Sequence, residues 1–249
     1  MHFDPIENAP FAESLMPDPV RLNGMTSAAS ALQMMERRQQ VLANNLANVS
    51  TRGFKAETPF ARMMGNAMAV TDTTLDTTAG TLTETHNPLD LAVAGDGFFV
   101  TQTPGGERFT RDGSFQLDSE RRLVDSRGNQ VLGEDGPIVL RNGKIEVESD
   151  GSVKVDGRLV SRLRLERVAD SAKLEHEGGT QFVPDATRQA IAAGERNVRQ
   201  GFVEESNVNS MSAMTAMIDV LHRYGAAQKT LSTLDSVRAI ATTEIGKPI

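Results

Sequence analysis

Four histidines are the side chains in this 249-residue sequence that are best suited to metal binding or acid–base chemistry. They are widely dispersed, at positions 2, 86, 176 and 222, and none lies two to four residues from a second histidine. Since the chain contains no cysteine, it can form neither a thiolate metal site nor a disulfide. The histidine spacing therefore predicts no metal site.

Other segments resemble reactive motifs only in part. The "GDGFF" segment at 95–99 lacks the third glycine and the following helix of a dinucleotide-binding loop. The "DGSVKVDG" segment at 150–157 lacks the alternating carboxylates and final glutamate of a calcium loop, so it predicts two hairpin turns. The pair Glu204-Glu205 is of a kind that is common on acidic surfaces. A dispersed Ser-His-Asp arrangement stays open, but without a nucleophile elbow we expect no enzyme, no catalytic residue and no cofactor.

The segment "LANNLANVSTRGFK" at 42–55 is unusual in another way, because three asparagines fall within five residues of an otherwise helical segment. They are Asn44, Asn45 and Asn48. Asparagine is a poor helix former, since its amide competes for backbone hydrogen bonds. The simplest interpretation is that the three side chains loosen the last helical turns before a bend at Gly53.

Two helices with narrow apolar stripes are predicted, one near each end of the chain. In the first, at 25–49, apolar residues recur at spacings of three and four; they include Met25, Leu32, Met35, Leu42 and Leu46. The second helix follows a cap at Asn207 or Asn209, and its stripe includes Met217, Tyr224, Leu231 and Leu234. Narrow stripes are typical of coiled-coil seams, so each helix should need the other or a neighbouring subunit.

Between the helices the pattern changes to short alternating or apolar runs. Five Asp-Gly pairs and Asn142-Gly143 separate these runs, and such pairs favour two-residue hairpin turns. The segment therefore predicts a β meander folded as a small barrel or sandwich. The predicted fold class is mixed α+β, with long N- and C-terminal helices that pair as a coiled coil and a central all-β domain inserted between them.

The pattern divides the chain into three parts. Residues 1–24 are acidic and contain four prolines, which predicts a disordered N-terminal extension. Residues 25–58 and 204–249 are predicted to form one discontinuous helical domain, and residues 59–203 the β-rich domain. No segment has the basic and apolar regions of a cleaved secretory signal or the length of a membrane span.

The composition limits the possible partners. A formal charge of −7 argues against binding to nucleic acid, which requires a basic face. Eight of the eleven methionines cluster in or near the two helical segments: Met34, Met35, Met63, Met64, Met68, Met211, Met214 and Met217. They are either adaptable core filling or a surface that repacks against several neighbours, and the sequence leaves both open.

Three blocks of sequence resemble the bacterial flagellar rod and hook proteins. The first contains "ANNLAN" at 43–48 followed by Thr51, Gly53, Phe54 and Lys55. The second begins with "NPLDLAVAGDGFFV", and the third is "QGFVEESNVNSMSAMTAMIDVLHRYGAAQKTLSTLDS". They occur in the order typical of the family and cover well over half of the chain. The chain length best suits a proximal rod protein, with a distal rod protein as the alternative.

The resemblance implies a non-enzymatic subunit of the flagellar basal body. Family members stack helically into a hollow shaft that spans the periplasm and transmits torque, with the helices inside and the β domain outside. The implied partners are copies of itself, neighbouring rod proteins and the flagellar type III export apparatus, which exports such subunits without signal cleavage. One departure is that family members usually begin their helix close to the first methionine, whereas here it is expected near Met25.

The resemblance also suggests a second role for the three asparagines. In a tube of packed helices, the amides of Asn44, Asn45 and Asn48 can bond adjacent subunits and fix their register. The two stripes, Asn207 and Asn209 are then expected at subunit contacts, with Gly53 and Phe54 shaping the junction between the helices and the β domain. The rival hypothesis is a secreted β-domain binding module or hydrolase with a helical stalk, which requires a pocket in 71–200.

Overall fold

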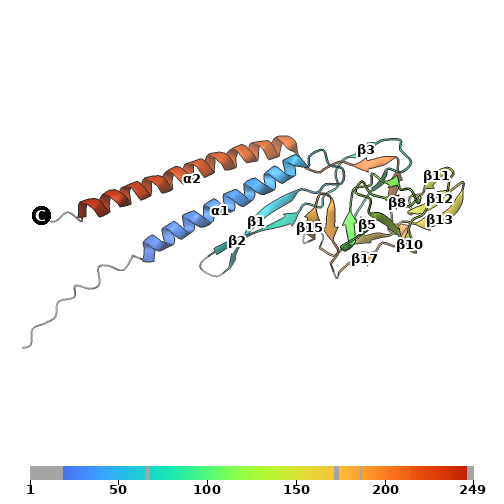
Figure 1. The fold of residues 1–249 in the computed structure, drawn as a ribbon, viewed down its shortest axis with the longest axis horizontal. Helices are drawn as coiled ribbons and strands as arrows, with labels where there is room; N and C mark the ends of the chain where they lie inside the picture. The colour runs from blue at the N-terminus through green and yellow to red at the C-terminus, as the bar shows by residue number, and fades with distance from the viewer. Residues whose placement is uncertain (1–18, 65–67, 171–173, 186, 246–249) are drawn as a thin grey trace, which may run out of the picture.

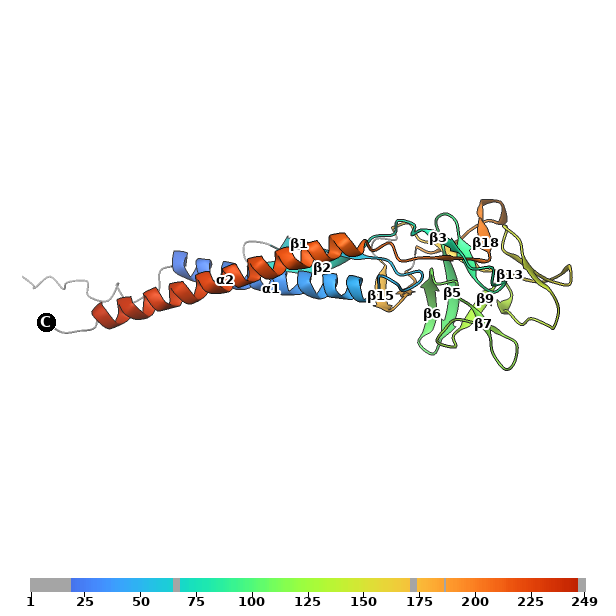
Figure 2. The ribbon, with the colours of Figure 1, turned by 90° about the horizontal axis from the view of Figure 1, so that it is seen from above.

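The computed structural model describes residues 19–64, 68–170, 174–185 and 187–245. The described chain is elongated, with two helices extending from one end of a β-rich body (Figures 1 and 2). Helix α1 is Pro19–Ala47 and helix α2 is Ser210–Ile245. Both meet the body at the same end, so they run antiparallel and side by side (Figure 1). Residues 1–18 of the predicted extension lie outside the described residues.

Asparagine side chains define the helix ends nearest the body. The Ser212 N–H donates to Asn209 Oδ1 at 2.9 Å, which satisfies an N–H that has no partner within α2. Asn209 is therefore the helix cap, and Asn207 lies in the loop before it. At the end of α1, Asn48 Nδ2 donates to the Asn44 carbonyl oxygen at 2.9 Å, and the chain then leaves the helix through a turn.

The predicted mixed α+β class with a coiled-coil stalk is wrong. The described residues contain two α-helices and nineteen strands, so the chain is mainly β. The predicted stripes do not close into a seam. Among the helix side chains whose burial is described, the buried ones lie toward the body; they are Val41, Asn45, Ala213 and Val220. The buried residues Val41 and Asn45 each come one position before a predicted stripe residue, Leu42 or Leu46. The buried side of α1 is shifted in this way because α1 also packs on a β-hairpin.

That hairpin consists of strands β1 (Glu57–Met64) and β2 (Met68–Leu75), which pair antiparallel. It forms a two-stranded sheet separate from the sheets of the body and lies along α1 (Figure 1). At its base, Leu75 is buried in an apolar cluster of the body that includes Phe109 and Phe182. Because two-stranded hairpins are marginal alone, this one depends on α1 and on its base. We call α1 and this hairpin together the arm.

The β body contains the remaining strands, most of them short. They are β3 (Leu82–Glu84), β4 (Leu91–Val93), β5 (Phe98–Thr103), β6 (Gly106–Thr110), β7 (Gln116–Leu117), β8 (Leu123–Val124), β9 (Gln130–Gly133), β10 (Gly136–Pro137), β11 (Ile145–Val147), β12 (Ser152–Val155), β13 (Arg158–Arg162), β14 (Leu165–Arg167), β15 (Glu175–Gly178), β16 (Gln181–Val183), β17 (Gln189–Ala190), β18 (Val198–Gln200) and β19 (Phe202–Glu204). One 3₁₀ turn spans Ala193–Glu195.

The strands of the body form one large sheet and several small ones. The large sheet has the order β15-β16-β6-β5-β9-β8-β7, with β10, β14 and β17 paired beside it, and β11-β12-β13 form a separate sheet. Strand β5 is buried on both faces: Phe98 belongs to one apolar cluster and Phe99 to the other. The last two strands, β18 and β19, pair with β4 and β3, respectively. These pairings lead the chain from the body into α2.

The predicted glycine turns are confirmed in one part of the body and wrong in another. Asp156-Gly157 forms a two-residue hairpin turn between β12 and β13, and both residues have positive φ (50° and 76°). Asp112-Gly113 connects no hairpin. A Cβ on Gly113 would lie 1.6 Å from the Leu91 carbonyl oxygen, so glycine serves close packing there.

Candidate functional site

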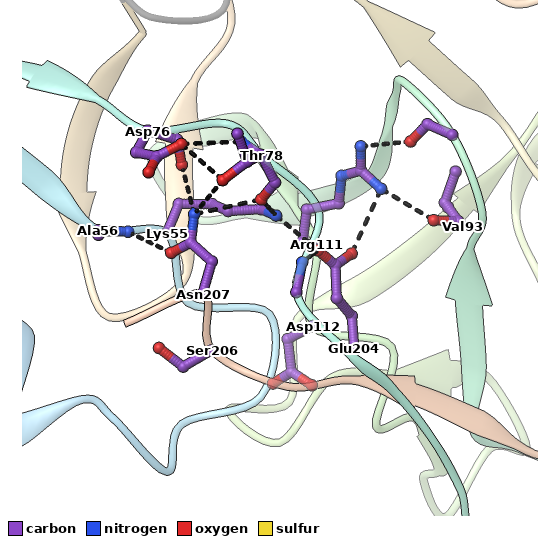
Figure 3. Close-up of polar contacts among 12 residues, drawn as sticks. Lys55, Ala56, Asp76, Thr78, Val93, Arg111, Asp112, Glu204, Ser206 and Asn207 are labelled. Atoms are coloured by element: carbon purple, nitrogen blue, oxygen red, sulfur yellow. Dashed lines mark hydrogen bonds and ion pairs between the residues drawn. The ribbon is translucent and has the colours of Figure 1, made fainter. Parts of the chain in front are cut away.

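The arm, the body and helix α2 meet at one junction, and a buried carboxylate lies at its centre (Figure 3). Glu204 ends strand β19, and its side chain is 0% exposed. Lys55 Nζ lies 2.5 Å from Glu204 Oε1, and Arg111 Nη1 lies 3.3 Å from Glu204 Oε2. The Gly80 N–H also donates to Oε1, at 2.9 Å. One carboxylate thus binds two buried cations and a backbone amide.

Backbone carbonyls also accept hydrogen bonds from the two cations, while the buried Arg111 Nε has no hydrogen-bond partner among the described residues. Lys55 Nζ donates to the Thr78 carbonyl at 2.6 Å, while Arg111 donates to Val93 at 2.9 Å and Gly95 at 2.6 Å. Burial lowers the pKa of the Lys55 ammonium and of the Arg111 guanidinium, and the negative charge of Glu204 opposes this effect in both. Each cation is therefore held in place by bonds to two different segments of the chain.

These charges connect three parts of the chain that are far apart in sequence. Lys55 follows α1, Arg111 follows β6, and Glu204 immediately precedes the segment that leads into α2. A buried ion pair often adds little stability over apolar packing, because both charges lose their water, but it requires one specific geometry. We therefore assign to this cluster the role of fixing how the helices leave the body.

Asn207 makes a second connection across the same junction (Figure 3). Its Oδ1 accepts from the Ala56 N–H at 2.8 Å, and its Nδ2 donates to the carbonyls of Asp76 (2.8 Å) and Thr78 (3.1 Å). The side chain thus bonds both strands at the base of the hairpin and joins them to the segment before α2. It satisfies backbone groups within its own chain.

Gly53 and Phe54 lie at the turn between α1 and the hairpin. The Gly53 N–H donates to the Glu204 carbonyl at 2.7 Å. Its φ is +68°, and a Cβ there would lie 2.2 Å from the Asp112 nitrogen, so only glycine fits. Phe54 is 0% exposed, and its ring makes an edge contact with His176, with 5.8 Å between the ring centroids.

The three asparagines of the opening helix have different surroundings. Asn45 is 6% exposed and exchanges two hydrogen bonds with the backbone of Glu57: Nδ2 donates to the carbonyl at 2.8 Å, and Oδ1 accepts from the N–H at 3.0 Å. Asn48 Oδ1 accepts from Thr51 Oγ1 at 3.1 Å within the turn that follows α1. Asn44 is exposed. The amide of Asn45 therefore joins the two halves of the arm.

Replacing Asn45 with Ala should destabilise the chain despite the higher helix propensity of alanine. The change leaves the N–H and carbonyl of Glu57 without their partner, which costs roughly 1–3 kcal/mol of unfolding free energy. Urea unfolding measures the change, with the exposed Asn44→Ala as the matched control. Equal stability of the two variants would contradict the assigned role of Asn45.

The predicted stripe residues are only partly covered. Leu32, Met35, Leu42 and Leu46 on α1, and Met217, Tyr224 and Leu231 on α2, are half-buried, and the side chain of Met25 lies outside the described set. Leu234 is 58% exposed. Val237 and Ile240 are exposed as well, and with Leu234 they form a group that is rotated around the helix relative to the exposed residues nearer the body. Nearer the body, four large apolar side chains are exposed at spacings of three and four along one side of α2, a set that we call the α2 apolar face: Met211, Met214, Ile218 and Leu221. Most of it lies beside the predicted stripe.

The residues at the centre of the junction are not found by sequence analysis. The surface position suggested for Glu204 is wrong, because this side chain is fully buried. Its partner Lys55 is 149 residues away, and no local pattern marks a pair at that separation. Among the described residues, no group of three possible ligands is placed to hold a metal. Neither described helix carries an apolar run long enough to cross a membrane.

Comparison with known proteins agrees with this architecture. Residues 25–55 match the family model "Flagella basal body rod protein", residues 92–155 the D1 domain of flagellar hook proteins FlgE/F/G, and residues 199–243 the C-terminal region of flagellar basal body rod FlgEFG proteins. The three matches cover α1 with the junction, part of the body, and the return into α2.

Proteins that match most of the length of this chain are also flagellar basal-body rod proteins. The flagellar basal-body rod protein FlgF of Mesorhizobium japonicum is 35% identical over 205 residues, covering 78% of this chain and 85% of that protein. FlgF of Escherichia coli is 31% identical, covering 84% and 92%. FlgG of Borreliella burgdorferi is 30% identical, covering 88% and 97%.

The three family models and the whole-chain relatives place the chain among the structural proteins of the bacterial flagellum. The chain belongs to the flagellar basal-body rod protein family. It is a structural subunit of the basal-body rod, and FlgF is the type named for most of the relatives with the highest identity.

Proposed function

We propose that this chain is a proximal rod subunit of the FlgF type, which polymerises helically with its neighbours into the hollow shaft that transmits torque. The observation that carries the proposal is the α2 apolar face. Met211 is 73% exposed, Met214 48% and Ile218 55%, although these side chains are buried in most folded proteins. An open apolar face of four large side chains on one helix is typical of a surface that a partner outside the single chain covers.

The assembly that such a face supports is open-ended. A head-to-tail contact between different surfaces of identical subunits builds a filament when its rotation does not close into a ring. We infer that the predicted packing residues act in this contact: the partly exposed stripe on each helix, together with the exposed Asn44. The junction around Glu204 then holds the helices in the direction that stacking requires.

Membership of the rod protein family supports three further inferences, which concern export, the type of rod protein and enzymatic activity. We infer that the subunit reaches the rod through the flagellar type III export apparatus without cleavage of a signal peptide. The FlgG type, in the distal rod, is the second candidate, because FlgG relatives match at 30–31% identity over 84–88% of the chain. Because the related proteins are structural rod proteins, we also infer that this protein has no enzymatic activity, and we favour the rod hypothesis over the hydrolase hypothesis.

A charge placed on the α2 apolar face should block assembly without unfolding the subunit. Ile218→Glu is expected to leave thermal unfolding within about 0.5 kcal/mol of the parent, as exposed substitutions usually do. It should abolish swimming when it replaces the chain in its own organism, because an unpaired charge would be buried between subunits. Gln228→Glu, on an exposed polar position of α2, is the control. Normal swimming with Ile218→Glu would contradict the assigned face.

A further inference from the structure

A histidine–glutamate pair joins the arm to the β body at a point away from the Glu204 junction. His176 Nδ1 lies 2.6 Å from Glu57 Oε1, and His176 Nε2 lies 2.8 Å from the Gly179 carbonyl oxygen. Both partners are acceptors, so each ring nitrogen must carry a hydrogen to make these bonds. With Glu57 ionised, which its lowered pKa favours, both bonds are made by the charged imidazolium form of His176.

Aromatic side chains hold the imidazolium ring in position. Phe182 stacks on it with 5.3 Å between ring centroids, and Phe54 contacts it edge-on at 5.8 Å. The side chains of His176 and Glu57 are 12% and 13% exposed. Because Phe182 of the body stacks on the ring, the ring stays with the body if the hairpin moves, so the ion pair depends on the position of Glu57 in the arm.

The pair borders a cavity of about 580 Å³ between α1, the hairpin and β15. Besides the pair, charged side chains reach this cavity from every element around it: Arg37 from α1, Asp72 from β2 and Glu175 from β15. Arg127, in the loop between β8 and β9, approaches from the body and disfavours the charge on His176. The cavity gives the pair a route for proton exchange with solvent.

The pair is also connected to the helix. The backbone of Glu57 exchanges two hydrogen bonds with the Asn45 side chain, at 2.8 and 3.0 Å. A single path of bonds thus runs from α1 through Asn45 and Glu57 to His176 and then to Gly179 in the body. Moving the arm away from the body breaks this path at the ion pair, which is the one link in it that titrates.

We propose that His176 and Glu57 form a protonation-dependent latch, which holds the arm against the β body and loosens it when the ion pair is lost. The latch is a property of the single chain and does not rest on the proposed rod function. The buried Lys55–Glu204–Arg111 cluster keeps the base of the arm attached in either state, so the change is a loosening of the hairpin and of the adjacent part of α1.

The direction of the pH dependence follows from the two groups. Burial of the His176 ring opposes its charge, but the bonds to Glu57 and Gly179 and the attraction of Glu57 outweigh burial, so the pKa of His176 is raised. Stability from this group is therefore fully present below about pH 6.5 and is lost as the pH rises through the folded-state pKa. The bond from His176 lowers the pKa of Glu57, so its contribution is lost only as the pH falls below about 4.3.

Hydrogen exchange of the hairpin tests the latch in the full chain. After correction for the intrinsic pH dependence of exchange, protection of the amides in Glu57–Met64 should fall between pH 6 and pH 9, by a factor of about ten for each unit by which the folded-state pKa of His176 exceeds the unfolded value. His176→Gln should remove this pH dependence, whereas His222→Gln, on the exposed face of α2, should retain it. Strand β5 provides an internal reference that should not change. Equal pH dependence in His176→Gln and the parent chain would overturn the proposal.

A second measurement does not depend on the folding of that variant. Titration of the parent chain by nuclear magnetic resonance should give His176 a pKa above the ordinary value of about 6.5. Glu57→Gln should bring it down toward or below that value, because burial then acts without the carboxylate. A His176 pKa at or below 6.5 in the parent chain, or one unchanged by Glu57→Gln, would overturn the latch while leaving the rod assignment untouched.

Discussion

Replacement of Glu204 with Gln is expected to destabilise the chain by about 3–5 kcal/mol, the usual effect of removing one partner from a buried ion pair. The loss is large because Lys55 and Arg111, 1% and 4% exposed at their side chains, would keep their charges without a counterion. Urea unfolding at neutral pH measures the change. Since natural domains are stable by only about 5–15 kcal/mol, a substantial part of the population should unfold in mild denaturant.

The neighbouring residue provides the control for this experiment. Glu205→Gln removes the same charge one position along the chain, from a partly exposed side chain. Its effect should stay within about 0.5 kcal/mol, as is usual for substitutions outside buried networks. If Glu204→Gln were as mild as Glu205→Gln, the buried cluster would not fix the junction, and the account of how the helices are oriented would be wrong.

Gly53→Ala is expected to destabilise the chain by about 2–4 kcal/mol, because two effects act together. The backbone has φ of +68°, which side chains other than glycine adopt at a cost, and the added Cβ would overlap the Asp112 backbone nitrogen at 2.2 Å. The chain can accept the methyl group only by moving the turn away from the body, which also weakens the bond from Gly53 to the Glu204 carbonyl. Thermal unfolding measures the change.

A glycine-to-alanine substitution within α2 should increase the stability of the chain instead of lowering it. Gly225 lies in α2 with open space around the position of its missing Cβ. Gly225→Ala should therefore stabilise the chain by up to about 1 kcal/mol through helix propensity. A neutral Gly53→Ala would mean that the turn is free to move, and the junction would then lack the rigidity that we assign to it.

Local patterns account for part of this fold. Apolar spacing predicts both helices, since a stripe at intervals of three and four requires only the neighbours of each residue along the chain. Alternation and Asp-Gly pairs predict the β meander, and Asp156-Gly157 forms its predicted turn for the same local reason. The pairing of the helices is not local, because it joins residues from opposite ends of the chain, and α1 also packs on the hairpin. The predicted coiled coil fails at that point.

The junction and the latch depend on contacts between distant residues. Lys55 and Glu204 are 149 residues apart, and Glu57 and His176 are 119 apart. One glutamate in an acidic chain looks like any other, and only the folded chain shows that Glu204 is buried against two cations. Asn45 is intermediate: its position in a helix is unusual enough to be singled out, but its bonds to Glu57 require the hairpin to fold back on α1.

Quantitative mass spectrometry of purified hook–basal bodies from the organism that carries this chain tests the central claim most directly. The account predicts that the chain is present in the particle, at about the abundance of the other proteins of short rod segments. Abundance several times higher would assign it to the distal rod instead of the proximal rod. Complete absence from the particle, in cells that express the chain, would contradict its role as a rod subunit.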